Sequence, residues 1–349
     1  MPNSTKTAGP PAREHDDTPA FTRLADLASA RVGGRALASS DDFFAPRANL
    51  LKPEAAIFVP GKFTSRGKWM DGWESRRRRS PGHDWCVVAL GMRGRIVGVD
   101  VDTSHFVGNH PSHCSIEAID ASGPVTASIV ARQGAPWRTI LAESVLQGNC
   151  HNYFRTDPNG PVSHLRLNIY PDGGVARFRA YGDVLVDWTR VAPAGRAADL
   201  ASIRNGGLVL GASDMHFGSK DNMIMPGRAR NMGDGWETRR RRGPGHDWAV
   251  VRLGAPGLLT RVEIDTNHFK GNYPDSASLE GCLTDADSLA ALELAQWRTV
   301  LPQTKLRAHH RHLFSRELEV AGAVSHVRLN IFPDGGVSRL RVHGTLASS

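Results

Sequence analysis

The sequence is short of cysteine, tyrosine and long apolar runs, and each shortage excludes a class of protein. Its 349 residues include four cysteines, none of them in a C-x-x-C pair. This excludes a zinc ribbon or a thioredoxin-like redox motif and favours reduced thiols in a cytoplasmic protein over a disulfide scaffold. The four tyrosines leave few rings for stacking against sugars. No stretch approaches the roughly 18 apolar residues of a membrane helix, so we expect no membrane partner.

Signatures of targeting and of common active sites are missing as well. Residues 1–17 are polar and contain no apolar core of a secretory signal, which favours a cytoplasmic location. No glycine-rich loop follows a strand and opens a helix, so nucleotide binding is unsupported. There is no G-x-S-x-G motif of a serine hydrolase.

An internal repeat dominates the remaining sequence. Residues 71–91 read DGWESRRRRSPGHDWCVVALG and residues 234–254 read DGWETRRRRGPGHDWAVVRLG, with 17 of 21 positions identical. Two further motifs recur in the same order: D-T-x-H-F-x-G-N-x-P from Asp102 and Asp265, and R-L-N-I-[YF]-P-D-G-G-V from Arg166 and Arg328. The first copy carries about ten extra residues before the first motif.

The length of the repeat determines the domain organisation. A unit of about 160 residues is the size of a whole domain, so the chain is a duplicated domain rather than a solenoid. We expect a disordered tail over residues 1–20, a first domain over 21–190, a linker over 191–200 and a second domain over 201–349.

Within each copy the local pattern indicates strands. Residues 165–170 and 175–181 alternate apolar and polar side chains with the period of two of a half-buried strand. Between them Pro171-Asp172-Gly173-Gly174 suits a turn, so we predict a hairpin, with Arg177 on its surface. Many short strands between glycine and proline turns predict an all-β protein of two tandem jelly-roll β-sandwiches. Residues 288–295 are expected to form a short helix.

Two runs of four arginines, at residues 76–79 and 239–242, carry much of the formal charge of +8. A guanidinium group binds a carboxylate through two parallel hydrogen bonds. Concentrated in a repeated motif beside acidic residues, such runs favour a small anionic ligand or an ion-pair network. No nucleic-acid module accompanies them, so we expect no nucleic-acid partner.

Histidine lies near aspartate twice in each copy. His83 and His246 each precede an aspartate, while His105 and His268 follow Asp102 and Asp265 by three positions. Histidine titrates near neutral pH, so these four are candidate acid–base groups. Burial of one side chain beside a turn is the structural alternative. The Asp-x-x-His spacing would also suit a divalent metal, but it is a weak signature, and we expect no cofactor.

Taken together, the three repeated motifs resemble the allantoicase family over residues 37–344. The resemblance implies two jelly-roll domains similar to galactose-binding modules, and a homo-oligomeric enzyme. It also implies an activity in allantoin degradation, the hydrolysis of allantoate to ureidoglycolate and urea.

The chemistry that the resemblance implies gives the candidate residues roles. Allantoate carries one carboxylate and two ureido arms on one carbon, so a site needs a cation, acceptors for N–H groups, a base and an acid. We expect the acid–base groups to be His83, His105, His246 and His268. We expect the substrate-binding residues to be Asp71, Glu74, Arg76, Arg78, Asn109, Asp234, Glu237, Arg239, Arg241 and Asn272.

Two alternatives stay open on the sequence. Each domain could carry its own site, or one site could draw residues from both copies. The competing functional hypothesis is a non-catalytic, galactose-binding-like ligand-binding module, because this kind of sandwich hosts both enzymes and binding domains.

Overall fold

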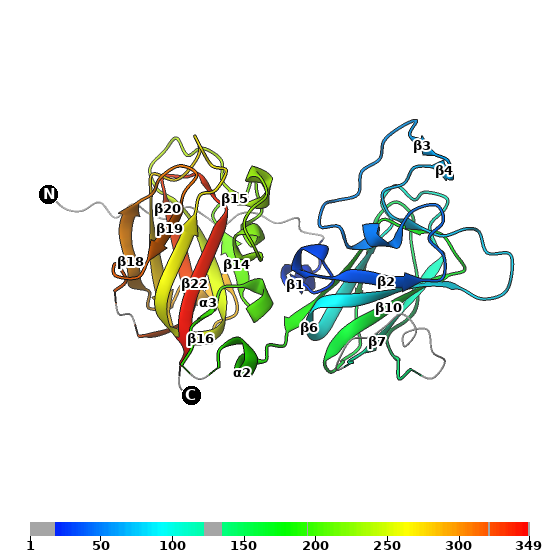
Figure 1. Cartoon of the computed structure of the whole chain (residues 1–349), viewed down its shortest axis with the longest axis horizontal. Coiled ribbons are helices and arrows are strands. Elements are labelled where there is room, and N and C mark those ends of the chain that lie inside the picture. The colour runs from blue at the N-terminus through cyan, green and yellow to red at the C-terminus, as the bar shows by residue number, and fades with distance from the viewer. Residues whose placement is uncertain (1–17, 122–134, 194, 320–321, 348–349) are drawn as a thin grey trace. The chain divides into compact units, whose positions relative to one another are not determined.

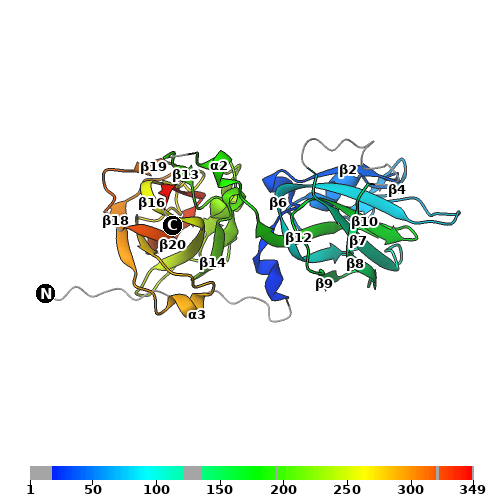
Figure 2. The same cartoon turned by 90° about the horizontal axis from the view of Figure 1, so that it is seen from below.

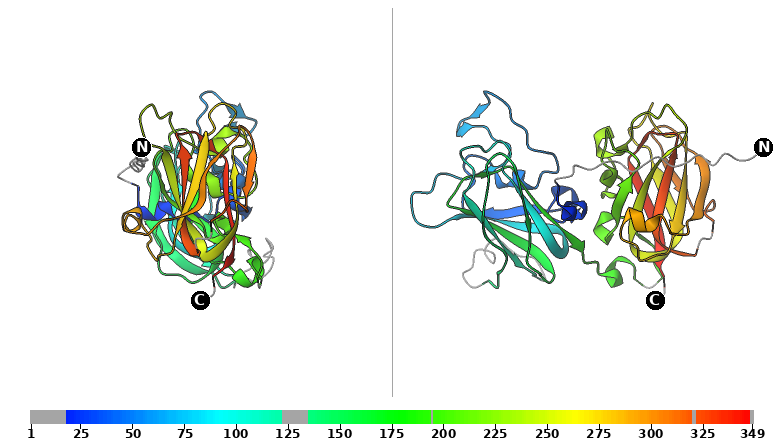
Figure 3. Two further views of the ribbon diagram at one scale, coloured as in Figure 1. Left: turned by 90° about the vertical axis from the view of Figure 1, so that its left-hand side faces the viewer. Right: turned by 180° about the vertical axis from the view of Figure 1, so that it is seen from behind.

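The chain folds into two compact units, described by a computed structural model over residues 18–121, 135–193, 195–319 and 322–347. The first unit is Thr18–Leu185 and the second begins at Val186. The regular secondary structure of both is mainly β-strand, joined by loops and short helices (Figures 1 and 3). Most of the tail expected over residues 1–20 lies outside the described residues, and a 3-10 helix, η1 (Ala20–Arg23), begins at its end.

One long strand, β6 (Asp84–Asp102), organises the first domain. Its first half pairs with β2 and β10, and its second half pairs with β12 and β9 (Figures 1 and 2). It therefore takes part in both layers of a β-sandwich. The remaining strands of the network are β2 (Arg35–Ser39), β7 (His113–Ile119), β8 (Arg138–Val145), β9 (His151–Arg155), β10 (Val162–Tyr170), β12 (Arg177–Val184) and the two-residue β1 (Ala25–Asp26).

The second domain repeats this topology around β16 (Asp247–Asp265). Its network comprises β13 (Ala198–Asp199), β14 (Leu208–Ala212), β17 (Ser276–Cys282), β18 (Arg298–Lys305), β19 (Arg311–Phe314), β20 (Ala323–Phe332) and β22 (Arg339–Leu346). β13 lies inside the segment expected to be linker and pairs with β22. Each domain is thus a jelly-roll β-sandwich, as predicted.

The predicted hairpin between residues 165–170 and 175–181 is wrong. β10 and β12 both pair with β6, along different stretches of it, and not with each other. Between them the chain forms β11 (Gly174–Val175), which pairs with β5 (Trp73–Glu74). Alternation of apolar and polar residues reports only which face of a strand is buried, so it cannot show that consecutive strands belong to opposite layers.

Helices are few and short in the described residues. The predicted helix near residues 288–295 is confirmed as α3 (Leu289–Leu292), and the Ser288 side chain accepts a hydrogen bond from the Ala291 N–H at 3.4 Å. Another short helix, α2 (Trp188–Val191), lies at the start of the second unit. No helix in the described part of the chain is long and apolar enough to cross a membrane.

Candidate functional site

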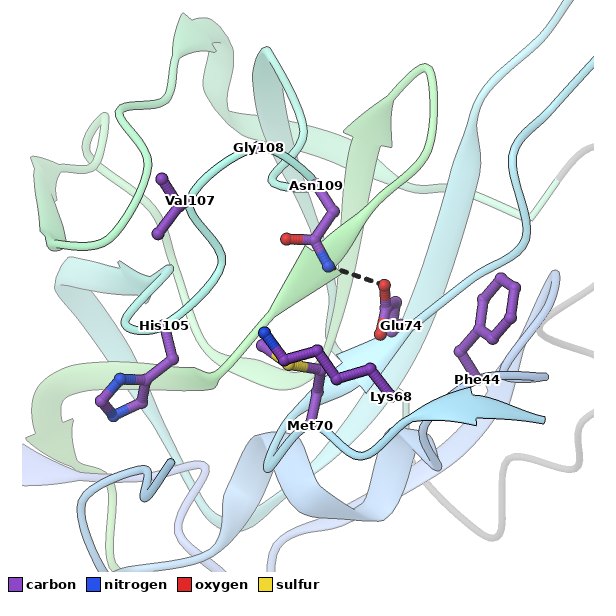
Figure 4. A pocket seen from close by; sticks show the side chains of 8 residues that line it. All are labelled: Phe44, Lys68, Met70, Glu74, His105, Val107, Gly108 and Asn109. Carbon is purple, nitrogen blue, oxygen red and sulfur yellow. Dashed lines mark hydrogen bonds between the residues drawn. The ribbon is translucent and has the colours of Figure 1, made fainter. Parts of the chain in front are cut away.

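A pocket of about 380 Å³ in the first domain brings together three of the candidate residues, Glu74, His105 and Asn109 (Figure 4). We call it the Glu74 pocket. Glu74 comes from β5, and the other two follow the end of β6. The full lining is Phe44, Lys68, Met70, Glu74, His105, Val107, Gly108 and Asn109.

Glu74 is held in place through both its backbone and its side chain. β5 pairs with β11 on one side, and Glu74 forms an isolated β-bridge with Ala45 on the other. The Asn109 side-chain amide donates a hydrogen bond to Glu74 Oε1 at 2.7 Å (Figure 4). Burial raises the pKa of the Glu74 carboxyl above its ordinary value, although the Asn109 hydrogen bond and the positive charge of Lys68 oppose the shift. This carboxyl therefore holds a proton more readily than an exposed glutamate does.

His105 adopts a backbone conformation that non-glycine residues rarely take, with a φ of 71°. Its N–H donates to Asn149 Oδ1 at 2.9 Å, and the ring stacks on Phe58 with centroids 5.9 Å apart. Such conformations cost energy and persist only where surrounding contacts hold them, often at functional sites.

The ring of His105 has a defined proton arrangement. Nε2 lies 3.1 Å from the carbonyl oxygen of Ala56. A carbonyl oxygen only accepts, so Nε2 carries the hydrogen and the neutral ring offers Nδ1 as a proton acceptor. Orientation by a backbone carbonyl is a common way to select one tautomer of histidine.

The buried pair of Asp71 and Arg177 holds the chain segment that contacts the His105 ring. Arg177, expected at the surface, is 2% exposed, and its guanidinium lies 2.6 Å from the Asp71 carboxylate. It also donates to the carbonyl oxygens of Glu54 and Ala55, which precede the Ala56 carbonyl at His105. Burial would raise the pKa of Asp71, but hydrogen bonds from Lys52, Arg177 and the Ile57 N–H lower it overall. Asp71 thus lies outside the pocket lining. We call the Asp71–Arg177 pair, together with the contacts of Asn109 with Glu74 and of His105 with Ala56, the frame of the pocket.

Lys68 and the apolar walls were missed by the sequence analysis. Lys68 ends a small hairpin, β3 (Phe63–Thr64) and β4 (Gly67–Lys68), which stands outside the sandwich (Figures 1 and 3). Its ammonium group reaches into the pocket (Figure 4) and lies 4.6 Å from the ring centre of Phe58. This hairpin belongs to the extra residues of the first copy, so comparing the two copies could not single out Lys68. The presence of extra residues in the first copy alone was the sequence signal that could have drawn attention to this segment.

The other first-domain candidates lie elsewhere. Arg76 forms an ion pair with Asp41 at 2.6 Å, and Arg78 forms one with Asp84 at 2.9 Å. The ring of His83 lies over Tyr170 with centroids 4.7 Å apart. None of the three lines the Glu74 pocket.

The second domain keeps the same hydrogen-bonded frame. Asn272 donates to Glu237, and His268 again has a φ of 71°, with Nε2 lying 2.9 Å from the Ala229 carbonyl oxygen. Asp234 is buried against Arg339 at 3.2 Å. Lys270 occupies the position of Val107, and no hairpin equivalent to β3–β4 occurs among the described residues.

The second arginine run borders a different pocket, of about 370 Å³. We call it the arginine pocket. Arg239 pairs with Asp214 at 3.1 Å and Arg241 with Asp247 at 2.5 Å. His246 lies over Phe332 with centroids 4.7 Å apart, and burial lowers its pKa. The lining of the arginine pocket comprises Ser213, Asp214, Arg239, Arg240, Arg241, Arg242, Gly243 and Asp247.

In the first domain, atoms of the Asp-x-x-His pattern are engaged by protein groups. Asp102 Oδ1 accepts a hydrogen bond from the Ser104 N–H at 2.8 Å, while His105 Nε2 contacts Ala56. Within the described ranges no group of three histidine, cysteine, aspartate or glutamate side chains is placed to hold a metal ion.

Comparison with known proteins gives consistent matches over nearly the whole chain. The family described as "Allantoicase repeat" matches residues 25–185 and again 198–347. "Probable allantoicase 1" of Burkholderia mallei is 51% identical over 95% of this chain and 97% of its own length. "Probable allantoicase" of Pseudomonas paraeruginosa is 49% identical over 93% of this chain and 96% of its own. The crystal structure of allantoicase from Saccharomyces cerevisiae superposes with a TM-score of 0.79 at 35% identity, covering 92% of this chain and 93% of that one.

Proposed function

This chain belongs to the allantoicase family, a family of hydrolases, and we propose that it hydrolyses allantoate to ureidoglycolate and urea in the Glu74 pocket. The observation that carries the location is the meeting of Lys68, Glu74, His105 and Asn109 around one cavity. These side chains supply the cation, the acid, the base and the acceptor for N–H groups that the substrate requires.

Lys68 is the group that we assign to the allantoate carboxylate. Its ammonium lies in the pocket (Figure 4) and is in no ion pair within the described part of the chain. The arginines expected for this role, Arg76 and Arg78, are engaged by Asp41 and Asp84. A charge-assisted hydrogen bond from Lys68 would orient the central carbon of the substrate between Glu74 and His105.

Glu74 and His105 are the groups that we assign to proton transfer. His105 Nδ1 accepts a proton from the attacking water or from the ureido N–H of the arm that stays. In the first route the water oxygen bonds to the central carbon as the C–N bond to the departing arm breaks. In the second route that arm leaves first, which forms a C=N bond to the remaining arm, and water then adds to the central carbon. In both routes the departing nitrogen needs a proton to leave as urea. Glu74 supplies that proton, because burial raises its pKa and keeps the carboxyl protonated at higher pH. General acid–base catalysis of this kind typically contributes about 10²–10⁴ in rate.

The remaining lining residues shape the pocket. Asn109 holds one oxygen of Glu74 at 2.7 Å and leaves Oε2 to face the substrate. Phe44, Met70 and Val107 form apolar walls. Such walls strengthen the charge interactions inside the pocket by reducing its contact with water.

Urea release from purified protein given allantoate tests this function, with and without prior treatment with EDTA. Urea in both samples supports hydrolysis by the side chains alone. Urea only in the untreated sample would move Asp102 and His105 to a metal site and would overturn their roles here. No urea in either sample, with folded protein, would favour the non-catalytic binding module.

We further propose that the enzyme is cytoplasmic and homo-oligomeric. All four cysteines are free thiols, and burial raises the pKa of Cys86 and Cys114 to about 12, which suits a reducing compartment. Oligomer formation rests on the family resemblance. Cell fractionation tests the location, and light scattering during size-exclusion chromatography tests the assembly: a monomeric mass would contradict it.

A further inference from the structure

The arginine pocket of the second domain has no role in the proposed reaction, yet it gathers all four arginines of the second run around one cavity. The pocket is formed by the segment between β15 (Trp236–Glu237) and β16, together with Ser213 and Asp214. Four arginines and two aspartates line it, so positive charge is in excess by two.

Three aspartates fix the arginine run. The backbone N–H of Arg239 donates to Asp214 at 2.7 Å, and that of Arg241 donates to Asp334 at 2.8 Å. The guanidinium of Arg241 is held by Asp247 at 2.5 Å. The backbone of the run is therefore ordered before any ligand arrives, which lowers the entropic cost of binding.

Arg240 and Arg242 are the two other arginines of the run. Their side chains are exposed, and neither is in an ion pair among the described residues. Adjacent like charges repel each other, and the aspartates that line the pocket already serve Arg239 and Arg241. An oxyanion between the two free guanidiniums would relieve this repulsion and use their planar donors.

We propose that the arginine pocket binds a small oxyanion-bearing molecule through Arg240 and Arg242, at a site separate from the Glu74 pocket. The volume of about 370 Å³ suits a small molecule rather than a polymer. A carboxylate and a phosphate share the chemistry that these guanidiniums recognise.

Calorimetric titration at low ionic strength tests the proposal, with malonate as the carboxylate probe and inorganic phosphate as the phosphate probe. The variants are Arg240→Gln/Arg242→Gln and, as a matched control, Arg298→Gln/Arg316→Gln, which removes two exposed arginines elsewhere in the same domain. We expect at least one probe to bind wild type and control alike, and the first variant to bind it at least tenfold more weakly. The probe that binds identifies the preferred oxyanion.

Three results would overturn the proposal. One is that neither probe binds the wild-type protein, and another is that all three proteins bind equally. The third is that Arg240→Gln/Arg242→Gln abolishes urea release from allantoate while its melting temperature is unchanged, because the arginine pocket would then belong to the active site. We expect its urea release to stay within twofold of wild type.

Discussion

In the first domain Glu74 shares a pocket with Lys68 and apolar walls, whereas in the second Lys270 replaces Val107 and no hairpin equivalent to β3–β4 occurs among the described residues. Both domains share two hydrogen bonds of the frame: one from an asparagine to a glutamate, and one between a histidine and an alanine carbonyl. The duplicated motifs therefore specify a frame. What distinguishes the two domains is the hairpin that carries Lys68, which lies outside the motifs, and the variable positions within them, such as Val107 and Lys270.

The buried arginine of the frame should give the largest effect when replaced. We expect Arg177→Met to lower the free energy of unfolding by about 3–5 kcal/mol, because it leaves the Asp71 carboxylate buried without its guanidinium partner. Arg339→Met should also lower the free energy of unfolding, since Arg339 is an ion-pair partner of the buried Asp234. Urea denaturation of both variants measures the losses. Unchanged stability in Arg177→Met would show that the pair is not part of the frame.

Replacing Lys68 or Lys270 should give the next largest difference, in kcat/KM for allantoate. We expect Lys68→Met to reduce kcat/KM for allantoate by roughly 30- to 150-fold, mainly through KM, as for a lost hydrogen bond to a charged group worth about 2–3 kcal/mol. Lys270→Met, the matched control in the other domain, should stay near wild type. A strong effect of Lys270→Met with none from Lys68→Met would move the site to the second domain.

Two equivalent histidines should give the smallest effect, seen as a dependence of stability on pH. Burial and the charge of Arg252 lower the pKa of His326 to about 4, whereas for His164 burial lowers the pKa and Asp120 opposes the shift. A neutral buried histidine stabilises the fold above its unfolded pKa of about 6.5, and this contribution is lost as the pH falls towards its folded pKa.

Comparison of wild type with His326→Gln isolates this titration from all others. Between pH 6.5 and 4 we expect the stability advantage of wild type to shrink by about 2 kcal/mol, and by less in the His164→Gln comparison. Chemical denaturation at several pH values measures both. A constant difference across this range would contradict the assignment for His326.

Much of the fold could be predicted from the sequence, because the duplication and the alternating patterns report domain size and strand positions. Strand partners could not: residues 165–181 read as one hairpin, while both strands pair with β6. Part of the candidate site could be predicted as well, since Glu74, His105 and Asn109 lie in repeated motifs and line one pocket. Lys68 could not, because its position depends on how the hairpin β3–β4 folds back towards the pocket.

Arg177 shows a further limit of sequence reasoning. A charged residue in an alternating strand is usually placed at the surface, since burial of a charge requires a partner. Its partner, Asp71, lies more than a hundred positions away, and only the folded chain brings the two together.

The central claim is that allantoate is hydrolysed in the Glu74 pocket of the first domain, and isosteric variants of the two equivalent glutamates test it most directly. Steady-state urea release should fall at least 100-fold in kcat for Glu74→Gln, which can keep the hydrogen bond from Asn109 but has no acidic proton to give, as expected for loss of a general acid. Glu237→Gln should remain within twofold of wild type. Equal losses in the two variants, or a loss in Glu237→Gln alone, would contradict the account.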